Sequence, residues 1–156
     1  MPHIPLEDHL PGITGLLEYR KDTAAPIREL TQFLLRGPSS LTEGERELIA
    51  TIVSYGNECR FCTSAHTAAA DLLLGECETT EKIKENISTA PVSAKMKALL
   101  TIASQVQKSG KAVTNESIEE AKAALDVLAY EGELWPGTVA AFKVELERSF
   151  KGGFRS

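Results

Sequence analysis

The chain has 156 residues, of which 42% are hydrophobic and 25% charged, a composition that suits one globular domain rather than a disordered or membrane chain. Its formal net charge of -5 lacks the concentrated basic face that nucleic-acid binding needs. No apolar run is long enough to span a bilayer, and the N-terminus lacks the features of a signal peptide. We therefore expect a cytoplasmic, soluble protein that binds neither nucleic acid nor membrane.

The hydrophobic pattern is helical almost throughout, because no segment alternates with period two for long enough to form a strand. Residues 1–25 are interrupted by prolines and glycines, so we expect an irregular segment there, with one short helix around Ile13 to Arg20. A helix is then predicted from Pro26, a residue suited to a first turn, to about Arg36, where a Gly-Pro pair ends it. Its apolar residues form one stripe: Ile27, Leu30, Phe33 and Leu34.

The next two helices are predicted from their capping residues. Thr42 and Glu45 have the spacing of a capping box, so a helix should start here and continue to Gly56. Asn57 can cap the following helix, which we expect to hold residues 59–74 and to end at Gly75. The residues of the first of these helices expected to be buried are Leu48, Ile49, Ile52 and Val53.

The second half of the chain predicts further helices joined by short polar connections. A short helix should begin at Thr79 or Thr80 and stop before Pro91, and a longer one should run from Ser93 to Lys108. Thr114 is predicted to cap a third helix. The last candidate helix covers residues 136–150, giving seven or eight helices in a single all-α domain over residues 1–156. The buried side expected for the longer helix consists of Met96, Leu99, Leu100, Ile102, Ala103 and Val106.

Two of the three cysteines and one of the three histidines fall within NECRFCTSAH, residues 57–66. In a reducing compartment a C-x-x-C pair indicates catalysis or metal binding rather than a structural disulfide. On one helix, Cys59, Cys62 and His66 would share a face. The first turn of a helix favours a thiolate, and an imidazole one turn later can accept the thiol proton. This window therefore predicts a nucleophilic thiol.

Glu47 is the candidate partner of His66, because it lies on the preceding helix on the same side as Thr51 and Ser54. A carboxylate that reaches His66, directly or through water, would fix the tautomer of the imidazole and complete a proton relay. A simpler interpretation is that Glu47 lies on a solvated helix face.

Two other interpretations of the cysteine window stay open at this point. The cysteines and the histidine can be small or polar residues packed inside a helix bundle. Alternatively, Cys59, Cys62, His66 and Cys77 can supply four zinc ligands, although the first three would come from one rigid helix face. Outside a zinc site, Cys77 is expected to be structural or incidental.

These residues resemble the core motif of a known enzyme family. Glu47, Cys59, Cys62 and His66 form the arrangement E-x11-C-x-x-C-x-x-x-H. The arrangement and its helical surroundings resemble the AhpD-like alkylhydroperoxidases, which belong to the wider carboxymuconolactone decarboxylase superfamily. The resemblance is most specific over residues 41–74 and extends more loosely through residues 97–110 and 113–124.

The resemblance implies an AhpD-like helical fold that assembles into a homo-oligomer (a dimer, trimer or hexamer). It implies that Cys62 attacks a small-molecule hydroperoxide and that Cys59 resolves the resulting sulfenic acid as a disulfide. His66 and Glu47 would move the protons. A dithiol or a thioredoxin-type or lipoyl-type reductant would return the electrons, and we expect neither a cofactor nor a bound metal.

Two parts of the chain depart from the family pattern. Phe61 stands between the cysteines, where the best characterised members carry a histidine, and an aromatic residue there is typical of a peroxidase-related subgroup. After about Ala124 the chain lacks the family's last long apolar helix, so residues 125–156 are expected to form an atypical C-terminal segment.

The leading hypothesis is therefore a thiol-dependent peroxidase. Two alternatives remain. One is a carboxymuconolactone-type decarboxylase, although such relatives generally lack the cysteine pair. The other is a non-catalytic helical module, either stapled by zinc or sensitive to redox state.

Overall fold

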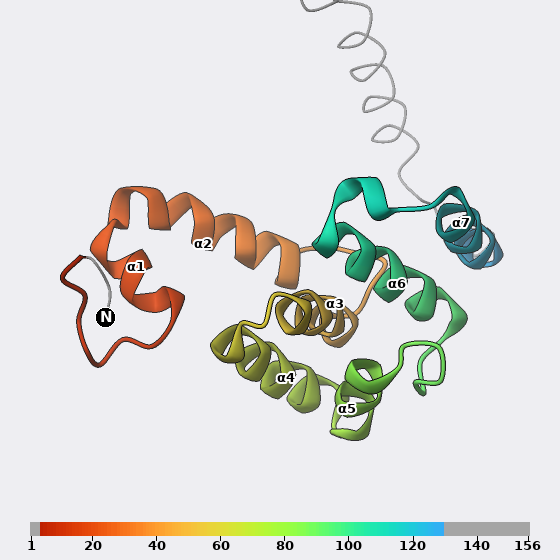
Figure 1. The fold of residues 1–156 in the computed structure, drawn as a ribbon, viewed down its shortest axis with the longest axis horizontal. Helices are drawn as coiled ribbons and strands as arrows, with labels where there is room; N and C mark the ends of the chain where they lie inside the picture. Colours follow the sequence, from red (N-terminus) through yellow and green to blue (C-terminus); the bar gives the residue numbers. More distant parts are fainter. Residues whose placement is uncertain (1–3, 130–156) are drawn as a thin grey trace, which may run out of the picture.

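The computed structural model describes residues 4–129 and gives them an all-α arrangement (Figure 1). This described part contains seven α-helices, one short 3-10 helix and no strand, which confirms the predicted fold class. The candidate helix over residues 136–150 lies outside the described residues. The elements are α1 (Ile13–Tyr19), α2 (Lys21–Arg36), α3 (Glu43–Gly56), α4 (Arg60–Leu74), α5 (Glu78–Glu85), α6 (Ala94–Lys108), η1 (Gly110–Ala112) and α7 (Asn115–Ala129).

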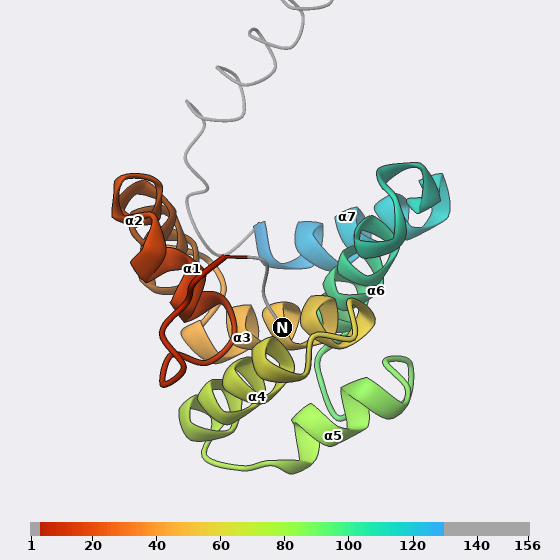
Figure 2. The same cartoon turned by 60° about the vertical axis from the view of Figure 1, so that its left-hand side comes forward.

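Helix α3 lies between α4 and α6 and packs against both (Figures 1 and 2). The predicted capping box fixes its start, because Thr42 Oγ1 accepts the Glu45 N–H and the Glu45 carboxylate accepts the Thr42 N–H. Burial of each large aliphatic side chain against α3 contributes about 1.5–3 kcal/mol. The core side chains of α3, Leu48 and Ile52, lie four residues apart and therefore on the same side of the helix. The core consists of Leu48, Ile52, Ala70, Ile83, Ala90, Met96 and Leu100.

The prediction for the start of α2 is wrong, because this helix begins at Lys21 rather than at Pro26. Arg20 has non-helical backbone angles (φ -124°, ψ 76°) and therefore separates α1 from α2. Its guanidinium donates two hydrogen bonds to Asp22. These bonds hold the pKa of the Asp22 carboxyl below its usual value, and an acidic side chain in a first turn also complements the helix dipole. Pro26 therefore lies inside α2 rather than in its first turn. Because proline has no backbone N–H, the helix lacks one backbone hydrogen bond at this position.

Helices α1 and α2 form an arm that extends from the rest of the described residues (Figure 1). Ala24 is the one buried residue in α2. The apolar stripe predicted for this helix is therefore exposed; Phe33, for example, keeps 65% of its accessible surface. We define the apolar face of the arm as Leu16, Tyr19, Ile27, Leu30, Phe33 and Leu34.

Two further helix boundaries differ from the predictions. Asn57 does not cap α4; it closes α3, and its side-chain oxygen accepts a hydrogen bond from Gln107. Helix α5 begins at Glu78, earlier than the predicted Thr79 or Thr80, and ends at Glu85, before Pro91 as predicted. It begins earlier because the Glu76 carboxylate accepts the N–H groups of Glu78 and Thr79. The side-chain hydrogen bond from Thr79, followed by these backbone hydrogen bonds, holds the pKa of Glu76 below its usual value.

The predicted buried residues of α3 and α6 are only partly confirmed. Met96 and Leu100 are fully buried, whereas Val106 is 53% exposed because it lies in the last turn of α6, away from the core cluster. Ile49 and Val53 of α3 are half-buried. The other residues predicted to be buried in α6 are also half-buried: Leu99, Ile102 and Ala103. Among the described residues, no helix combines the length and apolar character needed to cross a membrane.

Candidate active site at the start of helix α4

The cysteine pair lies at the corner between α3 and α4. Glu58 turns the chain there with a positive φ of 55°, and the Cys59 N–H then donates to the Ser54 carbonyl at 3.1 Å. Cys59 is the N-cap of α4, since its sulfur accepts the Cys62 N–H at 3.3 Å. The helix therefore begins at Arg60, and Cys62 lies in its first turn as predicted.

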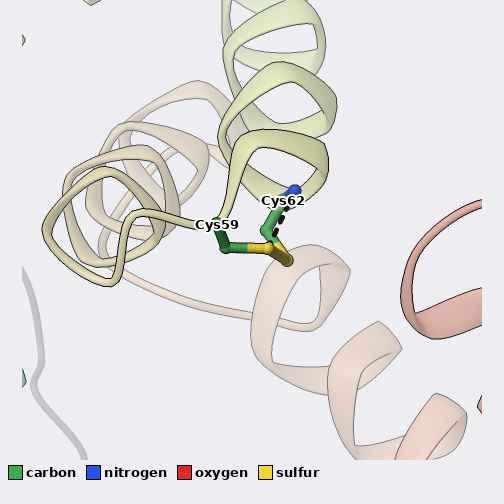
Figure 3. Close-up of a disulfide and its surroundings, with 2 residues drawn as sticks. All are labelled: Cys59 and Cys62. Atoms are coloured by element: carbon green, nitrogen blue, oxygen red, sulfur yellow. Dashed lines mark hydrogen bonds between the residues drawn. A yellow bond between two sulfur atoms is a disulfide. The ribbon is translucent and has the colours of Figure 1, made fainter. Parts of the chain in front are cut away.

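Cys59 and Cys62 are joined by a disulfide that closes this first turn (Figure 3). Their Cα atoms are 5.4 Å apart, within the usual range for a disulfide. Both residues are half-buried, so the pair can be reached from solvent. After reduction, the free backbone N–H groups and the dipole of α4 favour the thiolate form of a first-turn cysteine.

The predicted contact between Glu47 and His66 is present. His66 Nδ1 lies 2.7 Å from Glu47 Oε2, which joins α3 to α4. The Glu47 side chain is only 2% exposed, whereas that of His66 is 29% exposed. An ionised carboxylate only accepts hydrogen bonds, so an ionised Glu47 would place the proton of a neutral imidazole on Nδ1 and leave Nε2 free to accept one. His66 follows Cys62 by four residues, one helical turn.

Arg36, at the end of α2, also contacts the buried Glu47 carboxylate. Its Nη2 lies 2.5 Å from Glu47 Oε1, so the two carboxylate oxygens bind different partners. Arg36 was not predicted from the sequence, because the loop over residues 37–42 separates it from the helix of Glu47 and no local spacing indicates the contact. The one signal was a basic residue in the last turn of a helix, which is common on any surface.

Phe61 packs against the N-terminal segment. A Cβ atom at Gly12 would overlap the Phe61 ring, and Gly12 also has a positive φ of 57°, so both space and backbone favour glycine there. The segment before α1 therefore reaches the turn that carries both cysteines, a contact that no local pattern in the sequence indicates.

An apolar groove of about 410 Å³ lies beside His66, between α2, α3 and α4. Ile49 and Val53, which are not fully buried, contribute to its wall. Its dimensions and its lining suit a small organic molecule better than an ion. The groove is lined by Leu34, Leu35, Arg46, Ile49, Ala50, Val53, Ser54 and His66.

Cys77 is not part of this site. It is exposed and unpaired, and it lies just before α5, beyond the far end of α4. Helix α4 has 15 residues and is therefore roughly 22 Å long. One zinc ion binds its sulfur ligands at about 2.3 Å, so it cannot reach Cys77 together with the pair at the start of α4. The four-ligand zinc interpretation is therefore wrong.

Comparisons with known proteins show the family and the fold of this chain. The model of the "Carboxymuconolactone decarboxylase family" matches residues 21–108, more than half of the chain. A search of curated proteins found no match.

Two solved structures share the fold at 24% sequence identity. One is described as an alkylhydroperoxidase AhpD core, an uncharacterized peroxidase-related protein from Ralstonia eutropha JMP134; the match has a TM-score of 0.64 and covers 71% of this chain and 58% of that one. The other is an uncharacterized peroxidase-related protein from Silicibacter sp. TM1040, with a TM-score of 0.61 and coverage of 79% and 74%. The chain thus spans less than two thirds of the first of these relatives.

Proposed function

Since this chain belongs to the carboxymuconolactone decarboxylase family, we propose that it is a thiol-dependent peroxidase that reduces small-molecule hydroperoxides through its cysteine pair. The observation that carries the proposal is the position of the Cys59–Cys62 disulfide, one helical turn before a histidine held by a buried carboxylate. A disulfide of this kind is the oxidised state that such a reaction cycle must pass through.

The first step oxidises Cys62. The Cys62 thiol gives its proton to Nε2 of His66, and the thiolate sulfur attacks the terminal oxygen of the hydroperoxide. An S–O bond forms as the O–O bond breaks, and the leaving oxygen takes the bonding electrons and the proton held by His66. The products are a Cys62 sulfenic acid and an alcohol.

The second step forms the disulfide seen in Figure 3. The Cys59 thiol loses a proton, its sulfur attacks the Cys62 sulfur, and the sulfenic oxygen leaves with a proton as water. One hydroperoxide and two thiols thus give one alcohol, one water and one disulfide. A dithiol, either a small molecule or a thioredoxin-type or lipoyl-type protein, then supplies the two electrons and two protons that restore the thiols.

The groove beside His66 supports this assignment, because an apolar wall next to a proton acceptor suits the organic part of a hydroperoxide. We also propose that the protein works as a homo-oligomer. The apolar face of the arm supports this part of the proposal, since an exposed stripe of large apolar side chains on a helix indicates a contact surface.

The test is hydroperoxide consumption in the presence of a dithiol. The wild-type protein is expected to consume an organic hydroperoxide catalytically, and Cys62→Ser should lose that activity. Cys77→Ser is the matched control, because it removes a cysteine that lies outside the site. Wild-type activity that survives in Cys62→Ser would contradict the assigned nucleophile. A decarboxylase would show neither the hydroperoxide turnover nor its dependence on the cysteine pair.

A further inference from the structure

Arg36 is held in one orientation by three contacts. Its Nη2 lies 2.5 Å from Glu47 Oε1, its Nε lies 3.3 Å from Glu43 Oε2, and its Nη1 donates to the Leu35 carbonyl at 2.9 Å. Every nitrogen of the guanidinium group therefore has a partner, and the plane of the group is fixed against the Glu47 carboxylate.

The contact with Arg36 matters for the charge of Glu47, because the Glu47 carboxylate is buried. The Glu47 side chain is 2% exposed, so water supplies little of the solvation that its charged form requires. A buried carboxylate without a counter-charge takes up a proton rather than stay ionised. His66 in its neutral form brings no charge, and Arg46, the other nearby arginine, donates its hydrogen bonds to the Leu34 and Gly37 carbonyls. Among the side chains that contact Glu47 in the described residues, Arg36 carries the permanent positive charge.

The protonation state of Glu47 decides which imidazole nitrogen of His66 carries the proton. An ionised carboxylate accepts a hydrogen bond from Nδ1–H and leaves Nε2 without a proton. A protonated carboxyl would instead donate to Nδ1, and the imidazole proton would move to Nε2. In that tautomer His66 could no longer accept a proton from Cys62, one turn away.

We propose that Arg36 is a positioning residue: it keeps Glu47 as a hydrogen-bond acceptor and thereby fixes the Nδ1–H tautomer of His66. The consequence for thiol activation rests on the proposed peroxidase function, but the tautomer itself does not. Arg36 thus links the arm of α1 and α2 to the chemistry at the start of α4.

The direct test is ¹⁵N nuclear magnetic resonance of the histidine side chains, which distinguishes a protonated ring nitrogen from an unprotonated one. The full chain has three histidines, and a His66→Gln variant assigns the His66 signals. The wild-type protein is expected to show Nδ1–H, and Arg36→Met should shift His66 to Nε2–H. Arg36→Lys, which keeps the charge, should retain the wild-type tautomer.

Arg46→Met is the matched control. This variant removes an arginine that ties the same end of α2 to α3 through carbonyl groups, and whose side chain forms no hydrogen bond or ion pair with Glu47 in the described part of the chain. It should leave the His66 tautomer unchanged even where it lowers stability. The proposal would be overturned if His66 kept the wild-type tautomer in Arg36→Met. It would also be overturned if Arg46→Met changed the His66 tautomer as much as Arg36→Met does.

A double variant keeps the test valid where Arg36→Met alone does not fold. Glu47→Gln removes the buried charge, so Arg36→Met/Glu47→Gln contains no uncompensated carboxylate. If Arg36 acts through Glu47, His66 has the same tautomer in Glu47→Gln and in the double variant. A difference between these two would overturn the proposal. The spectra require no catalytic turnover. The effect of Arg36 on the His66 tautomer can therefore be determined even if the protein proves not to be a peroxidase.

Discussion

His66 Nδ1 lies 2.7 Å from Glu47 Oε2, and this contact joins the two helices that carry the candidate active site. The carboxylate is buried and the imidazole is partly exposed, so one end of the pair is fixed in the core while the other can meet a substrate. The geometry suits the general base that we propose, with its tautomer set by its partner.

Replacement of His66 should slow the oxidation of Cys62. Because a positioned general base contributes about 10²–10⁴-fold to a rate, His66→Gln is expected to lower the rate of reaction with an organic hydroperoxide by that order. Stopped-flow measurement of the reduced protein gives this rate directly. Glutamine retains hydrogen-bonding capacity, so thermal unfolding should change little, and a rate within threefold of wild type would exclude His66 as the base.

Removal of either partner in the Arg36–Glu47 ion pair should have unequal effects on stability. Arg36→Met leaves a buried carboxylate without its counter-charge and should lower the free energy of unfolding by roughly 3 kcal/mol. Glu47→Gln should cost less, about 1 kcal/mol, because both former partners are 29% exposed and can reach water. Urea unfolding measures both values. A larger loss in Glu47→Gln than in Arg36→Met would contradict the account of the buried charge.

Gly75 should be sensitive to substitution for a reason that involves the backbone alone. It closes α4 with φ 74°, and no atom lies within 4 Å of an added Cβ. Gly75→Ala is therefore expected to lower the free energy of unfolding by about 1–2 kcal/mol, because a residue with a Cβ adopts the left-handed conformation at that cost. Gly110→Ala is the matched control, because that position is equally open but lacks a positive φ. If urea unfolding gave the same loss of free energy for Gly75→Ala and Gly110→Ala, the positive φ of Gly75 would not explain its sensitivity.

The apolar face of the arm should mediate self-association. Phe33 and Leu30 are 65% and 58% exposed, so a glutamate at either position leaves the core intact and places a charge in the expected contact. Analytical ultracentrifugation should give an oligomer for the wild-type protein and a smaller species for Phe33→Glu. Lys21→Glu, on the same helix but outside the apolar stripe, should retain the wild-type mass. A monomeric wild-type protein would contradict the proposal.

The sequence predicted those features that depend on local chemistry. The Thr42–Glu45 capping box and the glycine end of α4 are encoded within a few residues, and both are present in the structure. The Glu47–His66 contact was predicted from two helices joined by a short turn together with the family motif, because spacing alone left a solvated helix face open for Glu47.

Features set by contacts between distant segments were not predicted. Arg36 reaches Glu47 across a loop whose path no local pattern defines. Asn57 closes α3 instead of capping α4, since its side chain accepts a hydrogen bond from Gln107, 50 residues later in the chain.

The central claim is tested most directly by counting thiols in the reduced protein before and after one equivalent of an organic hydroperoxide. The account predicts that the wild-type protein falls from three free thiols to one, with Cys59 linked to Cys62 in the peptide map and Cys77 still free. Cys59→Ser should instead stop at a trapped Cys62 sulfenic acid, and Cys62→Ser should keep both remaining thiols. Three thiols that remain in the wild-type protein, or a sulfenic acid that forms on Cys59, would contradict it.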